Sequence, residues 1–382
     1  MKVNENKAGI YIHIPFCKQA CTYCNFHFST SLKLKDDLIK ALKTEIGQRK
    51  NYLEERVVQS IYFGGGTPSL LSSADIFGIV NAIYKNFPVD EDTEITIEAN
   101  PDDIESQKLQ ELKSGGVNRI SLGIQSFFDV DLKQMNRSHN ALQAEKSLQL
   151  ISEGGFDNIT ADLIYGIPGQ SHAAWEKNIR TLLSYNIDHI SAYALTVEPK
   201  TALYHQVTTK KIAAPDDVHS AEQFDILVEL LIANGFEHYE ISNFARNQKY
   251  SRHNTSYWFG NWYAGFGPSA HSYNGISRQW NISNNAVYIK NIQNQEPIFE
   301  TEELTLTQQI NEFIMVSLRT MWGLDKNNFK RRFGEQKLND LMLEAENHIL
   351  NEYMREEEGK LIISAKGKFI SDGIIGDLFF MG

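Results

Sequence analysis

The feature that most constrains the fold is an alternation of strand-type and helix-type segments through the first half of the 382-residue chain. Short apolar runs predict strands, and segments with a helical repeat of apolar residues separate them. The expected strands are Gly9–Ile14, Ser60–Phe63, Glu94–Glu98, Arg119–Ile124, Ile159–Tyr165 and His189–Leu195. The expected helices are Leu34–Tyr52, Ala74–Phe87, Ser106–Lys113, Leu142–Ile151 and Ala173–Leu183. Six such units predict an α/β fold with a parallel sheet and right-handed crossovers, an incomplete (β/α)6 TIM-like barrel.

Chemically distinctive residues lie at the ends of these expected strands. The cysteines follow the first strand, Gly64–Pro68 the second, Glu98–Pro101 closes the third, Gln125 follows the fourth, and Asp162 lies within the fifth. Active sites of parallel α/β barrels lie at the carboxyl ends of the strands. Taken singly, each polar residue is better explained as a surface or capping residue. Their succession along the strand ends favours one common pocket.

All three cysteines of the chain fall within eight residues, as Cys17, Cys21 and Cys24 with the spacing C-x3-C-x2-C. Thiolates suit zinc and iron–sulfur clusters, and a structural zinc ion or an ordinary [4Fe–4S] cluster takes four protein ligands. Three cysteines on one loop therefore favour a [4Fe–4S] cluster with one iron open to an amino acid's amine and carboxylate. This arrangement resembles that of the radical S-adenosylmethionine (SAM) enzymes. A zinc site completed by His13 or His27 is the alternative that the spacing leaves open.

Composition narrows the class of protein further. A net charge of −11 and a pI near 5.5 argue against a general nucleic-acid binder. No apolar run is long enough to span a bilayer, and the polar residues Met1–Lys7 do not resemble a signal peptide. An odd number of cysteines without an export signal fits a reducing compartment. We therefore expect a cytoplasmic protein that does not bind nucleic acid.

The character of the sequence changes beyond Pro199. A helix is expected over Asp217–Asn234, and Gly235–Phe244 is expected to end it and form a strand. The segment Tyr250–Trp280 is rich in aromatic residues, Gly, Asn and His, so its composition is irregular, aromatic and polar at once. The expected domains are a partial barrel (1–200), a linker and aromatic, glycine-rich region that completes the barrel side (201–300), and a C-terminal domain (301–382).

The C-terminal domain is expected to be small and mixed. Helices over Gln308–Met321 and Glu335–Asn351, short strands near Lys360–Ile363 and a last helix ending near Asp377 resemble a winged-helix-like module. Because the chain is acidic, a lid or a dimerisation element is favoured over DNA binding.

Five motifs together resemble the oxygen-independent coproporphyrinogen III oxidase family of radical SAM proteins, over nearly the whole chain. They are Tyr11–Cys17, Gly64–Pro68, Gly123–Phe127, Met135–Arg137 and Asp162–Gln170. The resemblance implies that the three cysteines hold a [4Fe–4S] cluster. It also implies SAM contacts from Tyr11, Tyr23, Gly65, Gly66, Thr67, Glu98, Gln125, Arg137 and Asp162.

Two departures and one motif indicate the branch of this family. Phe26 stands where the oxidases carry a further cysteine, and the first strand begins almost at Met1, whereas the oxidases have a longer N-terminal arm. The segment His253–Trp258, HNTSYW, resembles the H-N-x-x-Y-W motif of the haem-chaperone branch, HemW. The resemblance implies haem binding by His253, Tyr257 and Trp258. His271 is a second candidate for the axial ligand.

Two alternatives remain open, one for the role of His253 in the HNTSYW motif and one for the function of the protein. The residues alone favour a structural loop in which His253 bonds to the backbone, and the resemblance favours haem binding. Oxidative decarboxylation of coproporphyrinogen III propionates to vinyls is the alternative function. The chaperone resemblance implies haem and acceptor haemoproteins as partners, respiratory enzymes among them. It is compatible with peripheral membrane contact and with a homodimer. No C-x-x-C-H sequence for covalent haem attachment is present.

Overall fold

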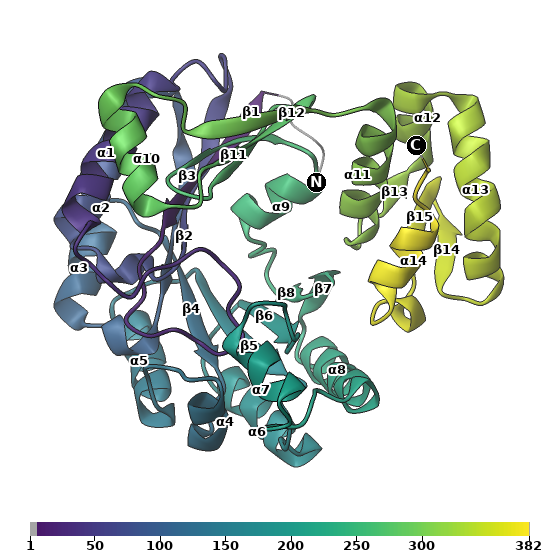
Figure 1. The fold of residues 1–382 in the computed structure, drawn as a ribbon. Helices are drawn as coiled ribbons and strands as arrows, with labels where there is room; N and C mark the ends of the chain where they lie inside the picture. Colours follow the sequence, from purple (N-terminus) through teal and green to yellow (C-terminus); the bar gives the residue numbers. More distant parts are fainter. Residues whose placement is uncertain (1–5, 382) are drawn as a thin grey trace.

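The computed structural model describes residues 6–381, so residues 1–5 and Gly382, which belong to the first and last expected domains, lie outside the described residues. Six parallel strands form the centre of the fold, as the sequence predicts. They are β1 (Lys7–Ile14), β2 (Val57–Gly65), β3 (Val89–Ala99), β4 (Arg119–Gln125), β5 (Ile159–Tyr165) and β6 (His189–Ala194). They form a curved, open sheet (Figure 1).

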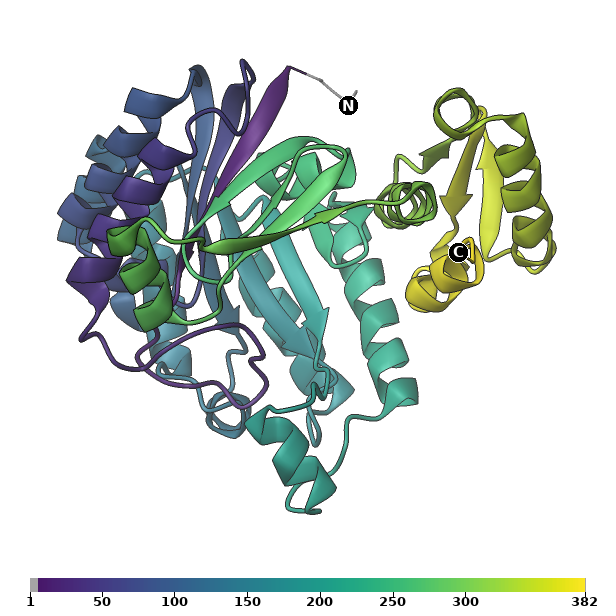
Figure 2. The ribbon, with the colours of Figure 1, turned by 45° about the horizontal axis from the view of Figure 1, so that its top comes forward.

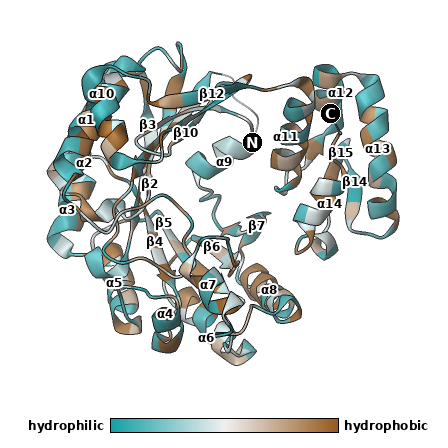
Figure 3. Ribbon diagram, viewed as in Figure 1, coloured by the Kyte–Doolittle hydropathy of each residue, from teal (hydrophilic) through white to brown (hydrophobic). Residues whose placement is uncertain are grey.

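Helices between these strands cover the convex face of the sheet (Figure 1). They are α1 (Lys35–Gln48), α2 (Ser73–Asn86), α3 (Ser106–Ser114), α5 (Ala141–Glu153) and α6 (His172–Leu183). A short helix that the sequence did not indicate, α4 (Asp129–Gln134), precedes α5. Figure 3 shows both hydrophobic and hydrophilic residues along the outer helices. This pattern follows because each helix buries one face, as Ile76, Ile79 and Ile83 do in α2, and leaves the other face to solvent.

Shorter strands extend the sheet at both edges, giving twelve strands in the order β12-β11-β10-β9-β1-β2-β3-β4-β5-β6-β8-β7. At one edge β9 (Trp262–Phe266) pairs parallel with β1, and β10 (His271–Tyr273), β11 (Ser277–Asn281) and β12 (Phe299–Glu303) continue antiparallel. At the other edge β8 (Asn243–Ala245) and β7 (Glu237–Glu240) follow β6. Three further helices, α7 (Ala202–Thr208), α8 (Asp217–Ala233) and α10 (Asn285–Asn294), lie between β6 and β12 in the sequence.

The segment Tyr250–Trp280, to which the sequence analysis assigned no helix or strand, contains α9 (Arg252–Trp258), β9, β10 and most of β11. Helix α9 lies on the concave side of the sheet (Figure 1). Its first turn is held by the buried Glu94 carboxylate, which accepts from the backbone N–H groups of Arg252 (2.9 Å) and His253 (3.3 Å). A carboxylate stabilises a helix N-terminus. This one comes from β3, so local sequence does not reveal it.

The last part of the chain forms a small α/β unit beside the open sheet (Figure 2). It contains α11 (Leu306–Leu318), α12 (Lys326–Phe333), α13 (Glu335–Leu350) and α14 (Ser371–Asp377). Its three-stranded sheet has the order β13 (Leu324–Asp325), β15 (Lys360–Ile363), β14 (Met354–Glu357). Ile314, Phe329, Leu341 and Leu361 are fully buried in its own core. Helix α12 was not predicted from the sequence.

The small unit contacts both edges of the large sheet. The chain enters it directly from β12, at one edge. Just after α11, Thr320 forms a β-bridge with Glu240 of β7, at the other edge, and the Met321 N–H donates to the Tyr239 carbonyl at 2.9 Å. Helix α11 therefore spans the distance between the two edges.

The expected division of the chain at residues 200 and 300 stays a prediction. Within residues 6–381, no helix is both long enough and apolar enough to cross a membrane.

Candidate cluster and cofactor site

The loop between β1 and α1 carries the three cysteines and crosses the carboxyl ends of the strands (Figures 1 and 2). Backbone hydrogen bonds fix it there: Cys17 N–H donates to Ser29 O (3.0 Å), Thr22 N–H to Met135 O (3.0 Å), and Leu203 N–H to Thr22 O (2.7 Å). All three thiols are free and partly buried. The first bond closes the loop on itself, and the other two tie it to the segments that carry Met135 and Leu203, with its thiols at the mouth of the barrel.

Burial keeps two of these thiols protonated in the metal-free protein. It raises the pKa of Cys17 to about 11, against a hydrogen bond from Thr67 that lowers it, and it also raises the pKa of Cys24. The charges of the neighbouring cysteines add to both shifts. Because metals bind thiolates, metal binding at this loop releases protons and strengthens as the pH rises.

The spacing of the thiols suits a cluster better than a single zinc ion. Among residues 6–381, the one group of three His, Cys, Asp or Glu ligand atoms lying within 4.8 Å of one another is His172, His219 and Glu222. At least one pair of the three thiols is therefore more than 4.8 Å apart, wider than sulfurs around one zinc ion, which lie roughly 3.8 Å apart for Zn–S bonds of about 2.3 Å. The donor set is also soft, as iron–sulfur clusters require.

The candidate fourth zinc ligands are engaged elsewhere. His13 Nε2 bonds to the His27 carbonyl at 2.9 Å, and its Nδ1 lies 3.3 Å from the Tyr11 hydroxyl. His27 Nε2 bonds to Asn285 Oδ1 at 2.8 Å. Neither ring therefore has Nε2 free for a metal beside the cysteines.

The glycine run after β2 packs directly against the cysteine loop. Gly66 N–H donates to Ile14 O at 2.9 Å and Thr67 N–H to Phe16 O at 2.6 Å. A Cβ on Gly66 would lie 2.6 Å from the Phe16 carbonyl oxygen, so no larger residue fits there without movement. Gly65, at φ +106°, occupies a conformation that favours glycine, and its N–H donates to Glu98 Oε2 at 3.2 Å. The run thus connects the cysteine loop to β3.

Arg137 joins the cysteine loop to the ends of β3 and β4. Its Nη1 lies 3.3 Å from Cys21 Sγ and 3.5 Å from the Tyr23 hydroxyl. Its Nη2 donates to Asn100 Oδ1 at 2.6 Å and to Gly123 O at 2.8 Å. These contacts place the guanidinium beside the thiols, where it could pair with a ligand carboxylate.

Two buried polar atoms next to the cysteine loop have no partner within the described part of the chain: Arg137 Nε and Gln125 Oε1. Gln125 also has φ +68°, an uncommon conformation for a residue with a side chain. An unpaired buried polar atom costs about 1–3 kcal/mol. Backbone strain and unsatisfied polar groups that coincide are typical of a site completed by its ligand. A cofactor with a charged amino-acid end fits this position.

Glu98 and Asp162 lie together in a cavity of about 60 Å³ deeper in the barrel. Burial raises the pKa of Glu98 to about 7, and the charge of Asp162 adds to the shift, while the Tyr62 hydroxyl donates to Glu98 Oε1 at 2.8 Å and opposes it. Burial likewise raises the pKa of Asp162 to about 7. The Tyr11 ring stacks on Tyr62 with 6.2 Å between centroids. Paired carboxyl groups of this kind can exchange hydrogen bonds with sugar hydroxyls.

The structure thus brings all nine expected SAM residues and the three cysteines into one connected region, which runs from the strand ends to the interior positions of Tyr11, Glu98 and Asp162. The sequence reasoning missed two contributors, Asn100 and Tyr62. Asn100 accepts from Arg137 and donates to Thr67 Oγ1 at 3.3 Å. Its place at the exit of β3 was the signal that could have identified it. Tyr62 lies within β2, where nothing in the sequence distinguishes it.

The expected haem residues lie apart from the cysteines, on α9. His253 is almost fully buried, and both of its ring nitrogens are engaged: Nδ1 with Ser60 Oγ at 3.0 Å and Nε2 with the Tyr257 hydroxyl at 2.7 Å. Burial lowers the pKa of His253 to about 3. Its ring stacks on Tyr62 with 4.9 Å between centroids. His271, on β10, is exposed. The axial-ligand assignments stay predictions.

The fold and the cysteine loop define a radical SAM protein, and the radical SAM superfamily profile matches residues 11–182. Over 372 residues the chain is 34% identical to the Heme chaperone HemW of Bacillus subtilis, covering 96% of this chain and 97% of that protein. It is 31% identical over 378 residues to the Heme chaperone HemW of Mycobacterium tuberculosis strain H37Rv, covering 97% and 94%. The chain belongs to the HemW family.

The fold is also that of a solved oxidase structure. Coproporphyrinogen III oxidase (HemN) from Escherichia coli, described as a radical SAM enzyme, superimposes with a TM-score of 0.85, covering 98% of this chain and 90% of that one. At 23% sequence identity, this likeness establishes the fold alone. The predicted incomplete barrel with a small C-terminal unit is confirmed.

Proposed function

We propose that this chain is a haem chaperone that holds a [4Fe–4S] cluster and SAM and passes haem to acceptor haemoproteins. The observation that carries the proposal is the match along almost the whole chain to relatives named Heme chaperone HemW, at up to 34% identity. The grouping of three thiols, Arg137 and the glycine run at one end of the barrel supports the cofactor part of the proposal.

Each residue of the site has a distinct role in holding the cofactors. Cys17, Cys21 and Cys24 ligate the cluster, which when bound supplies an open iron to chelate the amino and carboxylate groups of SAM. The unpaired Nε of Arg137 pairs with the SAM carboxylate, and Gln125 Oε1 accepts from a donor of the ligand. Tyr11 and Tyr23 form apolar walls, while Gly65, Gly66 and Thr67 allow the methionine part to approach the backbone. Glu98 and Asp162 hydrogen-bond the ribose hydroxyls.

For haem, the proposal involves the α9 residues His253, Tyr257 and Trp258. In the structure His253 reaches Tyr257 through a 2.7 Å hydrogen bond, so a direct bond from its Nε2 to iron requires that contact to open. A role in which His253 fixes Tyr257 requires no such change. Acceptor haemoproteins, membrane contact and a homodimer remain expectations from the resemblance.

The test is anaerobic reconstitution of the full chain with iron and sulfide, followed by titration with haem. We expect three thiols protected from alkylation, iron and sulfide near four per chain, and saturable haem binding with a shifted Soret band. His253→Ala should weaken haem binding while leaving iron and sulfide unchanged, and His205→Ala, an exposed histidine on α7, is the matched control. Absence of any saturable Soret change in the reconstituted wild type would contradict the chaperone proposal.

The same preparation distinguishes the alternative function. With SAM, a reductant and coproporphyrinogen III under anaerobic conditions, a chaperone yields no product beyond background. Formation of protoporphyrinogen at repeated turnover would identify an oxidase instead. The side chain of Phe26, at the position of the oxidases' further cysteine, is 68% exposed in this structure, and as phenylalanine it cannot ligate a cluster.

A further inference from the structure

A large cavity lies between the barrel and the small C-terminal unit, away from the cysteine loop. Its volume is about 880 Å³, in the upper part of the range of about 300–1,000 Å³ that is typical of ligand pockets. One wall comes from α9 and from β9, β10 and β11, and the other from α11, α12 and β15. The motif residues Tyr257 and Trp258 line it, which makes it continuous with the haem motif on α9.

Aromatic side chains make up much of the apolar lining. Besides the two motif residues they include Phe259, Tyr263, Phe313 and Trp322. The Phe259 and Trp322 rings lie 5.0 Å apart, and the Tyr257 and Tyr263 rings meet edge to face at 4.6 Å. These side chains are only partly buried, so flat apolar surface faces the cavity. Such a lining suits an extended aromatic ligand.

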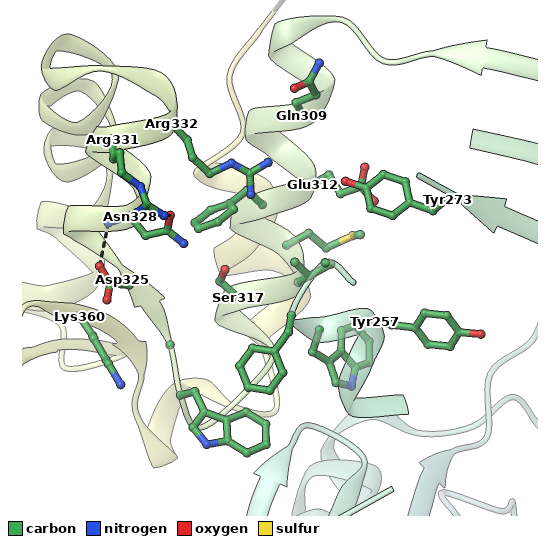
Figure 4. A pocket seen from close by; sticks show the side chains of 18 of the residues that line it. Tyr257, Tyr273, Gln309, Glu312, Ser317, Asp325, Asn328, Arg331, Arg332 and Lys360 are labelled. Carbon is green, nitrogen blue, oxygen red and sulfur yellow. Dashed lines mark hydrogen bonds between the residues drawn. The ribbon is translucent and has the colours of Figure 1, made fainter. Parts of the chain in front are cut away.

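The charges of the lining favour an anionic ligand. Four basic and two acidic side chains line the cavity in a chain whose net charge is −11. Both acidic groups are already engaged: Glu312 pairs with Arg278, and Asp325 accepts from the Asn328 N–H at 2.8 Å. Within the described residues, Arg331, Arg332 and Lys360 form no ion pair with a carboxylate. Figure 4 shows these three on the wall formed by the small unit, with Tyr257 and Tyr273 on the opposite wall.

We infer that this cavity binds the porphyrin of haem, with its macrocycle against the aromatic wall and its carboxylates on Arg331 and Arg332 of α12. The inference rests on the proposed haem function and adds the site and the basis of recognition. Guanidinium groups pair with carboxylates through two parallel hydrogen bonds, and their planar faces tolerate aromatic neighbours. The described lining contains no histidine or cysteine. Met315 and three tyrosines, which belong to side-chain types that can ligate haem iron, do line the cavity. Recognition is assigned to the ring and its carboxylates, so we expect binding without iron.

The test measures binding of protoporphyrin IX, by fluorescence quenching, and of haem, by the Soret shift, to the reconstituted full chain. We expect wild-type protein to bind both ligands with affinities within about tenfold, and the dimethyl ester of protoporphyrin IX more than tenfold more weakly. The double variant Arg331→Glu/Arg332→Glu should weaken the two diacids more than tenfold but bind the ester as wild type does, which shows that the cavity is intact. Lys337→Glu/Arg355→Glu, with the same charge change outside the cavity lining, should bind like wild type.

A second variant tests the apolar wall. Val316→Trp on α11 places bulk in the cavity and should reduce binding of the diacids and the ester alike. The site is wrong if wild type binds haem while both the Arg331/Arg332 variant and Val316→Trp bind it with unchanged affinity. The proposal that the cavity recognises the porphyrin ring and its carboxylates is wrong if haem binds but protoporphyrin IX does not. Absence of haem binding to wild type contradicts the proposed function itself, which separates the two failures.

Discussion

The hydroxyl of Tyr257 lies 2.7 Å from Nε2 of His253, one helical turn away on α9. Burial holds the pKa of Tyr257 well above its usual value and lowers the pKa of His253 to about 3, so the hydroxyl is protonated and the imidazole is neutral. A neutral imidazole has one donor and one acceptor nitrogen, and both are engaged, because Ser60 Oγ lies 3.0 Å from Nδ1. The histidine of the HNTSYW motif thus links the cavity-lining tyrosine to β2.

This linkage predicts a measurable coupling between the two residues. His253→Ala removes both hydrogen bonds and buried ring volume, and should lower the free energy of unfolding by about 2–4 kcal/mol. Tyr257→Phe removes one hydroxyl and should cost about 1 kcal/mol. In a double-mutant cycle measured by urea unfolding, the two effects should be less than additive, because each substitution already removes the shared bond. Additive effects would show that the bond contributes nothing.

The raised pKa values of Glu98 and Asp162 predict a pH dependence of stability in the cofactor-free protein. Each pKa is about 7 in the folded chain, above the ordinary values of 4.5 and 3.8. Between about pH 4.5 and pH 7 the unfolded chain ionises while the folded chain keeps its protons, so stability falls as the pH rises. Glu98→Gln should flatten this decline in urea unfolding between pH 4.5 and 8. Unchanged curves for the variant would contradict the assignment.

Substitution of Arg137 should weaken SAM binding without changing the iron and sulfide content of the cluster. Arg137→Met removes the guanidinium but no thiol, so iron and sulfide content should match wild type while SAM binding weakens more than tenfold, measured by equilibrium dialysis. Arg137→Lys should recover little, because one ammonium cannot reproduce contacts to Asn100, Gly123 and the ligand together. Arg180→Met, on the exposed face of α6, is the control. Normal SAM affinity in Arg137→Met would contradict this role.

Gly66 should control the position of the cysteine loop. In Gly66→Ala the new Cβ meets the carbonyl oxygens of Phe16 and Ile14 at 2.6 and 2.8 Å, and backbone must move. We expect reconstituted iron to fall by more than half, with a fold still cooperative in thermal unfolding. Gly373→Ala on α14, where nothing lies within 4 Å of the added Cβ, should keep full iron content and gain about 0.5–1 kcal/mol. Full iron in Gly66→Ala would show that the loop tolerates the shift.

The sequence predicts the parallel strands well because each contains a short stretch rich in apolar and β-branched residues, and β5 has its predicted bounds, Ile159–Tyr165. Helices α4 and α12 were not predicted because they are short, with six and eight residues, and their sequences DVDLKQ and KNNFKRRF contain few apolar residues. Helix α9 depends on the Glu94 carboxylate from β3, a contact that no local pattern contains. The cysteine spacing and strand exits predicted which residues gather at the barrel mouth. The large cavity was not predicted, because its two walls come from segments more than 30 residues apart in the chain.

A barrel with six parallel strands is left with a gap, and here the gap is framed by β12 on one side and by the Glu240–Thr320 bridge on the other. Exposed strand edges invite pairing with other chains. The helix that crosses this seam, α11, keeps the β7 side occupied, and the acidic run Phe299-Glu-Thr-Glu-Glu303 discourages pairing at the β12 side. Helix α11 and the acidic run together protect the two edges of the open sheet from aggregation, and α11 with the Thr320 bridge also sets the width of the gap between them. Substitutions that loosen the Thr320 bridge should therefore promote self-association and alter what the gap can hold.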